Sequence, residues 1–168
     1  KELIEKAKNM KLIVRAGAGV DNIDVQSATG QKIPVMNTAS ANSLAAAEQT
    51  LALLFCVARS IPQASRTLSE GKWDRASFKG RELDGKLLGI VGLGNIGQIV
   101  AEKAVALGMR VAGYDPQHKQ LSDFPRLSKW AESISILENL DHVLEKADFL
   151  TLHVPKTKET THLMNSAR

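Results

Sequence analysis

The sequence is poor in cysteine, since Cys56 is the only one in 168 residues. No disulfide can form within the chain, which is typical of a protein from a reducing compartment and favours a cytoplasmic location. Cys56 lies in the apolar stretch LALLFCVA, so we expect it to pack against a helix neighbour rather than to react. Histidine is also scarce, and no cluster of Cys and His indicates a metal site.

Aromatic side chains are few as well: four Phe, two Trp and one Tyr. The net charge is +4, but Lys and Arg are scattered among Asp and Glu rather than gathered in one segment. Nucleic-acid-binding proteins need a basic face, and many add aromatic platforms for the bases. We therefore expect a mixed, solvated surface and no nucleic-acid partner.

Long hydrophobic runs are missing too. The most apolar segment, Leu51 to Val57, is interrupted by Arg59 and followed by Pro62, so it falls short of a membrane span. The first residues, KELIEKAKNMK, are typical of a charged helix and not of a signal peptide. We expect no membrane partner. The chain starts with Lys instead of Met, as an excised or incomplete piece would.

The first 37 residues are expected to form a helix, a strand, a helix and a strand, too little to build a core of their own. The two strands are KLIVRAG and KIPVMN, and the second helix covers Val25 to Thr29 before Gly30. A long helix follows, from Ser43 to Arg59, with Asn42 or Ser43 as its cap. It is apolar on more than one face, so we expect it to be buried on more than one side.

The rest of the chain has the pattern of an α/β domain, in which apolar strands alternate with helices. KLLGIVG is a continuous apolar run, typical of a parallel strand covered on both faces, and RVAGYD is the next strand. Between them one helix face is predicted from the spacing of Ile96, Ile99, Val100, Ala104 and Leu107. Residues 117–136 are expected to be an irregular excursion, ENLDHVLEKA a helix and DFLTLHVP a third core strand. The fold class is therefore α/β, a Rossmann-type doubly wound parallel sheet that is truncated, with about three of its usual six or so strands.

Three glycines, Gly92, Gly94 and Gly97, form the pattern G-x-G-x-x-G between the first two of these strands. In a strand–turn–helix context the first permits a tight turn, the second lets a pyrophosphate approach the backbone, and the third lets helix and strand pack closely. The N–H groups around Asn95 and Ile96 would attract the anion.

The acidic residue Asp115 ends the second strand, 18 positions after Gly97. There it would accept hydrogen bonds from ribose hydroxyls and repel a 2′-phosphate, which favours NAD over NADP. His118 and Lys119 lie nearby and would soften that preference. The alternatives left open are a βαβ unit without a ligand and one that binds FAD or S-adenosylmethionine.

Several blocks in order, RAGAGVDNID, VMNTASANSLAAAEQTLALL, GKWDR, LDGKLLGIVGLGNIG and GYDP, resemble the D-2-hydroxyacid dehydrogenases. The resemblance runs from about Lys11 to Asn165, nearly the whole chain. It implies an oxidoreductase that transfers a hydride between NAD and a small 2-hydroxy acid. Among family members the blocks are closest to those acting on 3-phosphoglycerate in serine biosynthesis.

The resemblance also implies further site residues. Ala18 and Gly19 would face both the substrate carboxylate and the nicotinamide, and Val154 would line the adenosine side. Many relatives carry Thr where this chain has Ala18 and Val154, so any hydroxyl contact at these two positions is lost. Arg or another polar residue often fills the position of Asn95. The helix from Ser43 to Arg59 would contribute to a homodimer interface.

Catalysis in this family uses an Arg, a Glu and a His that the resemblance places downstream of Arg168. Arg168 itself stands in the context NSAR, but TTHLMN matches an earlier family block, so Arg168 is not expected to be the catalytic Arg. His118, His142, His153 and His162 have no carboxylate at a partnering spacing. No catalytic residue is thus expected in the chain, which alone would bind cofactor without turnover.

These readings divide the chain into residues 1–37, the end of a flavodoxin-like lid or substrate domain, and residues 38–168, an incomplete NAD-binding domain. Two alternatives from other classes remain. One is a non-catalytic NAD-binding dimer of the kind found in corepressors with this fold. The other is a truncated remnant without activity.

Overall fold

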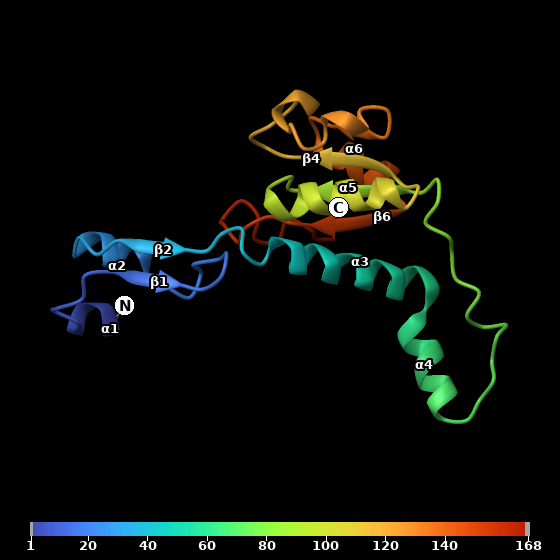
Figure 1. Ribbon diagram of the computed structural model, residues 1–168, viewed down its shortest axis with the longest axis horizontal. Coiled ribbons are helices and arrows are strands. Elements are labelled where there is room, and N and C mark those ends of the chain that lie inside the picture. The colour runs from blue at the N-terminus through green and yellow to red at the C-terminus, as the bar shows by residue number, and fades with distance from the viewer. Residues whose placement is uncertain (1, 167–168) are drawn as a thin grey trace. The chain divides into compact units, whose positions relative to one another are not determined.

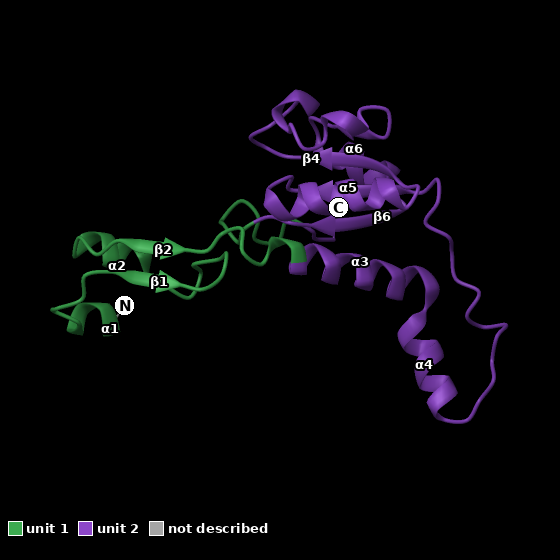
Figure 2. Cartoon of the chain, in the orientation of Figure 1, with its two compact units in different colours: residues 1–44, 155–163 green, residues 45–154, 164–168 purple. Residues whose placement is uncertain are grey.

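The computed structural model describes residues 2–166, whose contacts group into two compact units (Figures 1 and 2). Unit 1 comprises residues 1–44 and 155–163, and unit 2 comprises residues 45–154 and 164–168. Unit 2 contains the larger sheet and its helices, whereas unit 1 is built on two short strands.

Unit 1 contains the predicted helix, strand, helix and strand. They are α1 (Glu2–Lys6), β1 (Ile13–Arg15), α2 (Val25–Gly30) and β2 (Val35–Asn37), which confirms the prediction for residues 1–37. The two strands are parallel, with Ile13 opposite Val35 and Arg15 opposite Asn37. Unit 1 nevertheless has a small core of its own, formed by the buried side chains of Ile4, Ala28 and Ile33, so the expectation that these residues build no core is wrong.

The long helix α3 (Ser43–Arg59) is followed by α4 (Ile61–Ser69). The left-handed backbone of Ser60, at φ 51°, separates them, and Pro62 stands in the first turn of α4. No single described helix is long and apolar enough to cross a membrane; α3 and α4 reach that length and composition only together, as a pair bent by 68°.

The prediction that α3 is buried on more than one side is wrong for this chain. Ala47 and Ala58 are buried, but Leu53 is 55% exposed and Val57 is 73% exposed. The helix packs Ala47, Ala58 and, in part, Leu54 against the core of unit 2 and leaves other large apolar side chains at the surface. An apolar sequence shows that a face can be buried, but not that the same chain supplies the cover.

The main sheet has four parallel strands in the order β5-β4-β3-β6. They are β3 (Leu87–Val91), β4 (Arg110–Tyr114), β5 (Ile134–Ile136) and β6 (Phe149–Leu152). The prediction of three strands missed β5, because three residues of strand inside an irregular segment carry too little pattern to be seen. The order matches the first four strands of a doubly wound sheet, so the Rossmann-type α/β class is confirmed.

Helices cover both faces of this sheet. The helix α5 (Asn95–Ala106) packs with Leu88 and Ile90 of β3, while α6 (Leu140–Lys146) packs on the opposite face, behind Gly89. A Cβ at Gly89 would lie 2.8 Å from Val143, so this glycine lets α6 approach the strand. The predicted inward face of α5 is correct for its interior, but Leu107, the cap residue, is 39% exposed.

Residues 117–136 form part of the core and are not only a surface excursion. Two 3-10 turns, η1 (Leu121–Asp123) and η2 (Ser128–Trp130), lead into β5. Between them Phe124 and Leu127 are almost fully buried. Glu102 of α5 holds this segment through ion pairs with Arg126 and Lys129, both at 2.8 Å, and these two hydrogen-bonded cations lower the pKa of its carboxyl.

Candidate functional site

The glycine-rich turn connects β3 to α5 at the carboxyl end of the sheet. Gly92 has a φ of +90°, and a Cβ there would lie 2.5 Å from the carbonyl oxygen of His153. A Cβ on Gly97 would collide with the carbonyl oxygen of Gly92. Two of the three glycines are therefore required by the packing of this chain itself.

Gly94 differs from the other two. Its φ of −67° and ψ of −162° suit any residue, and a Cβ placed on it would meet nothing within 4 Å. The fold thus gives no reason for glycine here, whereas a ligand lying on the backbone would. The open space over the backbone of Gly94, called the cradle below, fits a pyrophosphate.

The first turn of α5 begins beside this cradle. Gly94 is the N-cap and has no side chain to satisfy the helix N–H groups. Among the hydrogen bonds of the described residues, none uses the N–H of Asn95 or Ile96. Two backbone donors and the positive end of a 12-residue helix are available to an anion at this point.

Asp115 follows β4, and its carboxylate is tied to the glycine-rich turn. Its Oδ2 accepts the N–H of Leu93 at 3.0 Å, and its Oδ1 accepts the N–H of Gln117 at 2.9 Å. Asp115 is half-buried, so its orientation is fixed while part of each oxygen stays accessible. A carboxylate held this way suits ribose hydroxyls, which need an acceptor at a set distance from the pyrophosphate.

Val154 lies two residues after the end of β6 and packs against the same turn. Its Cγ1 would be 2.9 Å from a Cβ on Gly92. The end of β6 is fixed by the His153 N–H, which donates to the carbonyl of Val91 at 2.7 Å. The structure thus brings Gly92, Gly94, Asn95, Ile96, Gly97, Asp115 and Val154 together at the carboxyl ends of three neighbouring strands.

Two contributors to this turn were not foreseen from the sequence. Leu93, almost fully buried, supplies the N–H that anchors Asp115. Gln98 donates from its side-chain amide to the carbonyl of Leu93 at 2.9 Å, which closes the turn against α5. Both contacts depend on the folded turn, and a Leu or Gln at these positions gives no signal by itself.

Ala18 and Gly19 belong to unit 1, where they follow β1. The carbonyl of Ala18 accepts a hydrogen bond from the side-chain amide of Asn37 at 2.6 Å, and that of Gly19 accepts one from Arg15. Arg15 also forms an ion pair with Asp21 at 3.3 Å. The loop is therefore held by side chains from the ends of both strands of unit 1.

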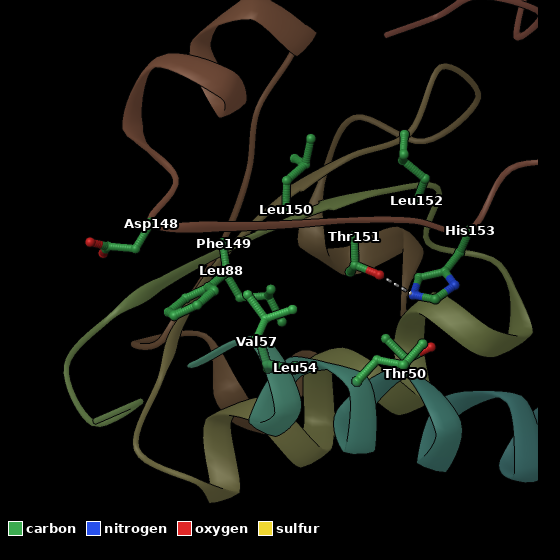
Figure 3. Close-up of a pocket in the computed structure, with 11 residues that line it drawn as sticks. Thr50, Leu54, Val57, Leu88, Asp148, Phe149, Leu150, Thr151, Leu152 and His153 are labelled. Atoms are coloured by element: carbon green, nitrogen blue, oxygen red, sulfur yellow. Dashed lines mark hydrogen bonds between the residues drawn. The ribbon is translucent and has the colours of Figure 1, made fainter. Parts of the chain in front are cut away.

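A groove of about 650 Å³ runs between α3 and the edge strand β6 (Figure 3). Leu54 and Val57 line one wall, and Phe149 and Leu152 line the other. Its polar lining comes from Thr50, Asp148, Thr151 and His153, and the Nε2 of His153 lies 3.1 Å from the hydroxyl of Thr151 (Figure 3). The groove contains neither the glycines nor Asp115, so it is separate from the cradle.

Among the hydrogen bonds and ion pairs of the described residues, none joins His118, His142 or His153 to a carboxylate. Burial lowers the pKa of His153, which keeps its ring neutral at neutral pH and fits a structural role. His118 is exposed and packs edge-on against Phe124, and His142 is exposed on α6. Arg168 lies outside the described residues. Within residues 2–166 no group of three or more His, Cys, Asp or Glu could hold a metal ion.

Sequence comparisons agree with this geometry. Residues 51–168 match the family described as D-isomer specific 2-hydroxyacid dehydrogenase, NAD binding domain. The chain is 45% identical over 164 residues to D-3-phosphoglycerate dehydrogenase of Methanocaldococcus jannaschii, covering 98% of this chain and 30% of that protein. It is 44% identical over 164 residues to hydroxypyruvate reductase of Thermotoga maritima, covering 98% of this chain and 50% of that protein.

Solved structures give the same result. The NAD-dependent formate dehydrogenase of Staphylococcus aureus, in complex with NAD, superposes with a TM-score of 0.85 at 31% identity, covering 98% of this chain and 47% of that one. TT0316 of Thermus thermophilus superposes with a TM-score of 0.84 at 35% identity, covering 98% and 50%. The chain thus spans about a third to a half of the length of these relatives.

The family match covers most of the chain and includes the whole glycine-rich turn, Asp115 and Val154. Its description agrees with the open cradle at Gly94 and the fixed carboxylate beside it. The chain belongs to the D-isomer specific 2-hydroxyacid dehydrogenases, matches their NAD-binding domain over residues 51–168, and has NAD as its cofactor.

Proposed function

We propose that this chain is the cofactor-binding portion of a cytoplasmic enzyme that transfers a hydride between NAD and a 2-hydroxy acid, with 3-phosphoglycerate as substrate in serine biosynthesis. The observation that carries the proposal is Gly94, whose open backbone lies beside the fixed carboxylate of Asp115. The substrate is supported by relatives named D-3-phosphoglycerate dehydrogenase, at 42–45% identity over nearly the whole chain.

The residues of the cradle have separate parts in this proposal. The N–H groups of Asn95 and Ile96 bind the pyrophosphate above Gly94, and Gly92 and Gly97 shape the turn that presents them. Asp115 accepts hydrogen bonds from the adenosine ribose and excludes a 2′-phosphate by charge. Val154 packs on the adenosine side. NAD, when bound, supplies the hydride acceptor or donor.

The substrate side is assigned to unit 1. Ala18 and Gly19 face the substrate carboxylate and the nicotinamide, so residues 1–37 act as the end of a substrate domain and residues 38–168 as the NAD-binding domain. No general base or carboxylate-binding Arg is assigned within residues 2–166. The proposal places the catalytic Arg, Glu and His in the part of the longer relatives that this chain does not span.

The experiment has two stages. NAD and NADP are first titrated into the chain by calorimetry, with Asp115→Asn as the test variant and Asp141→Asn, in the first turn of α6, as the matched control. We expect NAD to bind more tightly than NADP. Asp115→Asn should reduce the difference between the two affinities, and the control should leave it unchanged.

The second stage tests the reaction. The protein that contains this chain is assayed for reduction of NAD with 3-phosphoglycerate, D-glycerate and D-lactate. The highest kcat/KM is expected with 3-phosphoglycerate. NAD binding without reduction by any of the three acids, in the protein with all of its domains, would contradict the proposed reaction and leave a binding module.

We further propose a homodimer formed through α3. Large apolar side chains stay exposed on this helix, among them Phe55 at 37% and Val57 at 73%. The following helix α4 buries none of its residues, although Ile61 and Leu68 are apolar. Apolar surface of this extent is typical of an interface.

The dimer is tested by sedimentation equilibrium. Val57→Lys adds one positive charge within α3 and is expected to shift the chain toward the monomer. Glu145→Gln changes the net charge by the same amount on an exposed position of α6 and is expected to have no effect. A monomeric unsubstituted chain, or equal effects of the two variants, would contradict an interface at α3.

A further inference from the structure

The loop that carries Ala18 and Gly19 has three consecutive carbonyl groups, each with a fixed partner. The carbonyl of Gly17 accepts the N–H of Thr38 at 3.2 Å. The carbonyl of Ala18 accepts the side-chain amide of Asn37 at 2.6 Å, and the carbonyl of Gly19 accepts the guanidinium of Arg15. In addition, the N–H of Gly17 donates to the hydroxyl of Thr38 at 2.8 Å.

A fixed carbonyl also fixes the N–H of the next residue. In a trans peptide unit the C=O and the following N–H point in opposite directions, and the described residues contain no cis peptide bond. The N–H groups of Ala18, Gly19 and Val20 are therefore turned away from the partners of the three carbonyls. None of these N–H groups takes part in a hydrogen bond among the described residues.

The partners come from one place in the fold. Arg15 ends β1 and Asn37 ends β2, and the two residues lie opposite each other in the parallel register. Thr38 is the next residue after β2. All three lie at the carboxyl ends of two paired strands, and the N–H groups of Ala18, Gly19 and Val20 point away from them. Three such donors suit a carboxylate, which accepts hydrogen bonds on both of its oxygens.

We propose that Asn37 is a positioning residue for the substrate: its side-chain amide holds the peptide plane between Ala18 and Gly19 so that the Gly19 N–H faces the carboxylate of the 2-hydroxy acid. The proposal rests on the proposed function, which assigns the substrate to this loop. Asn37 itself is exposed and lies behind the loop, so it acts through the backbone and does not touch the substrate.

The position of Asn37 allows a clean substitution. Asn37→Leu keeps the approximate shape of the side chain, adds no charge and removes the donor to Ala18. The matched control is Thr29→Val, which removes another side-chain hydrogen bond of unit 1, from the Thr29 hydroxyl to the Val25 carbonyl at 2.8 Å. Thr29 lies in α2 and makes no contact with the loop through that bond.

The experiment follows the backbone amides by ¹H–¹⁵N NMR while D-glycerate is added to the chain saturated with NAD. In the unsubstituted chain the amides of Ala18, Gly19 and Val20 are expected to shift. Asn37→Leu should weaken the apparent affinity for D-glycerate roughly tenfold, as loss of one oriented donor to a charged acceptor does. The NAD affinity of both variants, and the D-glycerate affinity of Thr29→Val, should stay unchanged.

Three results would overturn the positioning role. Equal D-glycerate affinity in the unsubstituted chain and Asn37→Leu would show that the amide does not orient the loop. Equal weakening by Asn37→Leu and Thr29→Val would show a general effect on unit 1. If the loop amides of the NAD-saturated chain do not respond to D-glycerate at all, both the positioning role and the substrate assignment fail, which separates this outcome from the other two.

Discussion

Two glycine-containing loops in this molecule expose backbone N–H groups, and they are held in different ways. The turn from Gly92 to Gly97 is fixed by packing: a carbonyl of His153 lies against Gly92, and Leu93 is almost fully buried. The loop from Gly17 to Gly19 is fixed by the side chains of Arg15, Asn37 and Thr38, which form hydrogen bonds at the surface.

The two kinds of support predict how strongly a substitution in each loop lowers the free energy of unfolding. A turn held by close backbone packing belongs to the core, so a change within it affects the stability of the whole unit. A loop held by exposed hydrogen bonds contributes little to stability, since each such bond is worth only about 1 kcal/mol net. Its substitutions should act on ligand affinity instead.

The largest effect is expected for Gly92→Ala. The new Cβ would lie 2.5 Å from the His153 carbonyl oxygen, at a φ of +90° that alanine rarely adopts. Strain and overlap together should lower the free energy of unfolding by about 3 kcal/mol. Urea unfolding followed by circular dichroism measures the change. A loss below about 1 kcal/mol would mean that the turn is not part of the packed core.

Gly94→Ala separates ligand binding from packing within the same turn. Its backbone suits alanine and its Cβ would meet nothing within 4 Å, so stability should stay within about 0.5 kcal/mol of the unsubstituted chain. The methyl group would occupy the space over the cradle, and NAD affinity should fall at least about tenfold. Calorimetric titration with NAD tests this, and an unchanged NAD affinity would contradict the assignment of the pyrophosphate to Gly94.

A pH dependence is expected from His153, whose backbone covers Gly92. Burial lowers the pKa of this ring below its ordinary value of 6.5. As the pH decreases through that value the unfolded chain takes up the proton first, so the free energy of unfolding should fall between about pH 7.5 and pH 5.5. Stability measured in His153→Gln should lose most of this slope; an equal slope in both chains would assign it to other groups.

A small effect on stability is also expected for Thr38→Val, in the loop held by side chains. The substitution removes the hydroxyl that accepts the Gly17 N–H at 2.8 Å and leaves the Thr38 N–H in place. Because the site is exposed, water can replace the lost acceptor, and stability should drop by about 0.5 kcal/mol or less. A loss of unfolding free energy as large as that of Gly92→Ala, in the same urea experiment, would show that the two loops contribute equally to stability.

Local patterns in the sequence predicted much of the fold correctly. The apolar run of β3, the helix face of α5 and the strand ending at Asp115 lie within one βαβ unit. Each of these signals is contained in a short segment, so no distant contact was needed to interpret it. The glycine pattern in this context, followed by Asp115, indicated the cofactor for the same reason.

Structural features that depend on contacts between distant residues were missed or predicted wrongly from the sequence. The strand β5 is only three residues long and exists because it pairs with β4. Phe124 and Leu127 are buried although their segment has no regular periodicity. The apolar side chains of α3 were expected inside, yet Val57 stays exposed, because the sequence does not say which surface covers it.

The sequence by itself determined the class of fold and, through a resemblance of ordered blocks, the family and its NAD cofactor, since these signals lie in short segments. Only the tertiary structure decided which glycines are required by packing: Gly92 and Gly97 meet distant or neighbouring backbone, and Gly94 meets open space. It also decided that Asn37 holds the carbonyl of Ala18, 19 residues away. The reason is physical, because a contact between separate strands and loops is created by folding and leaves no periodic trace in the chain.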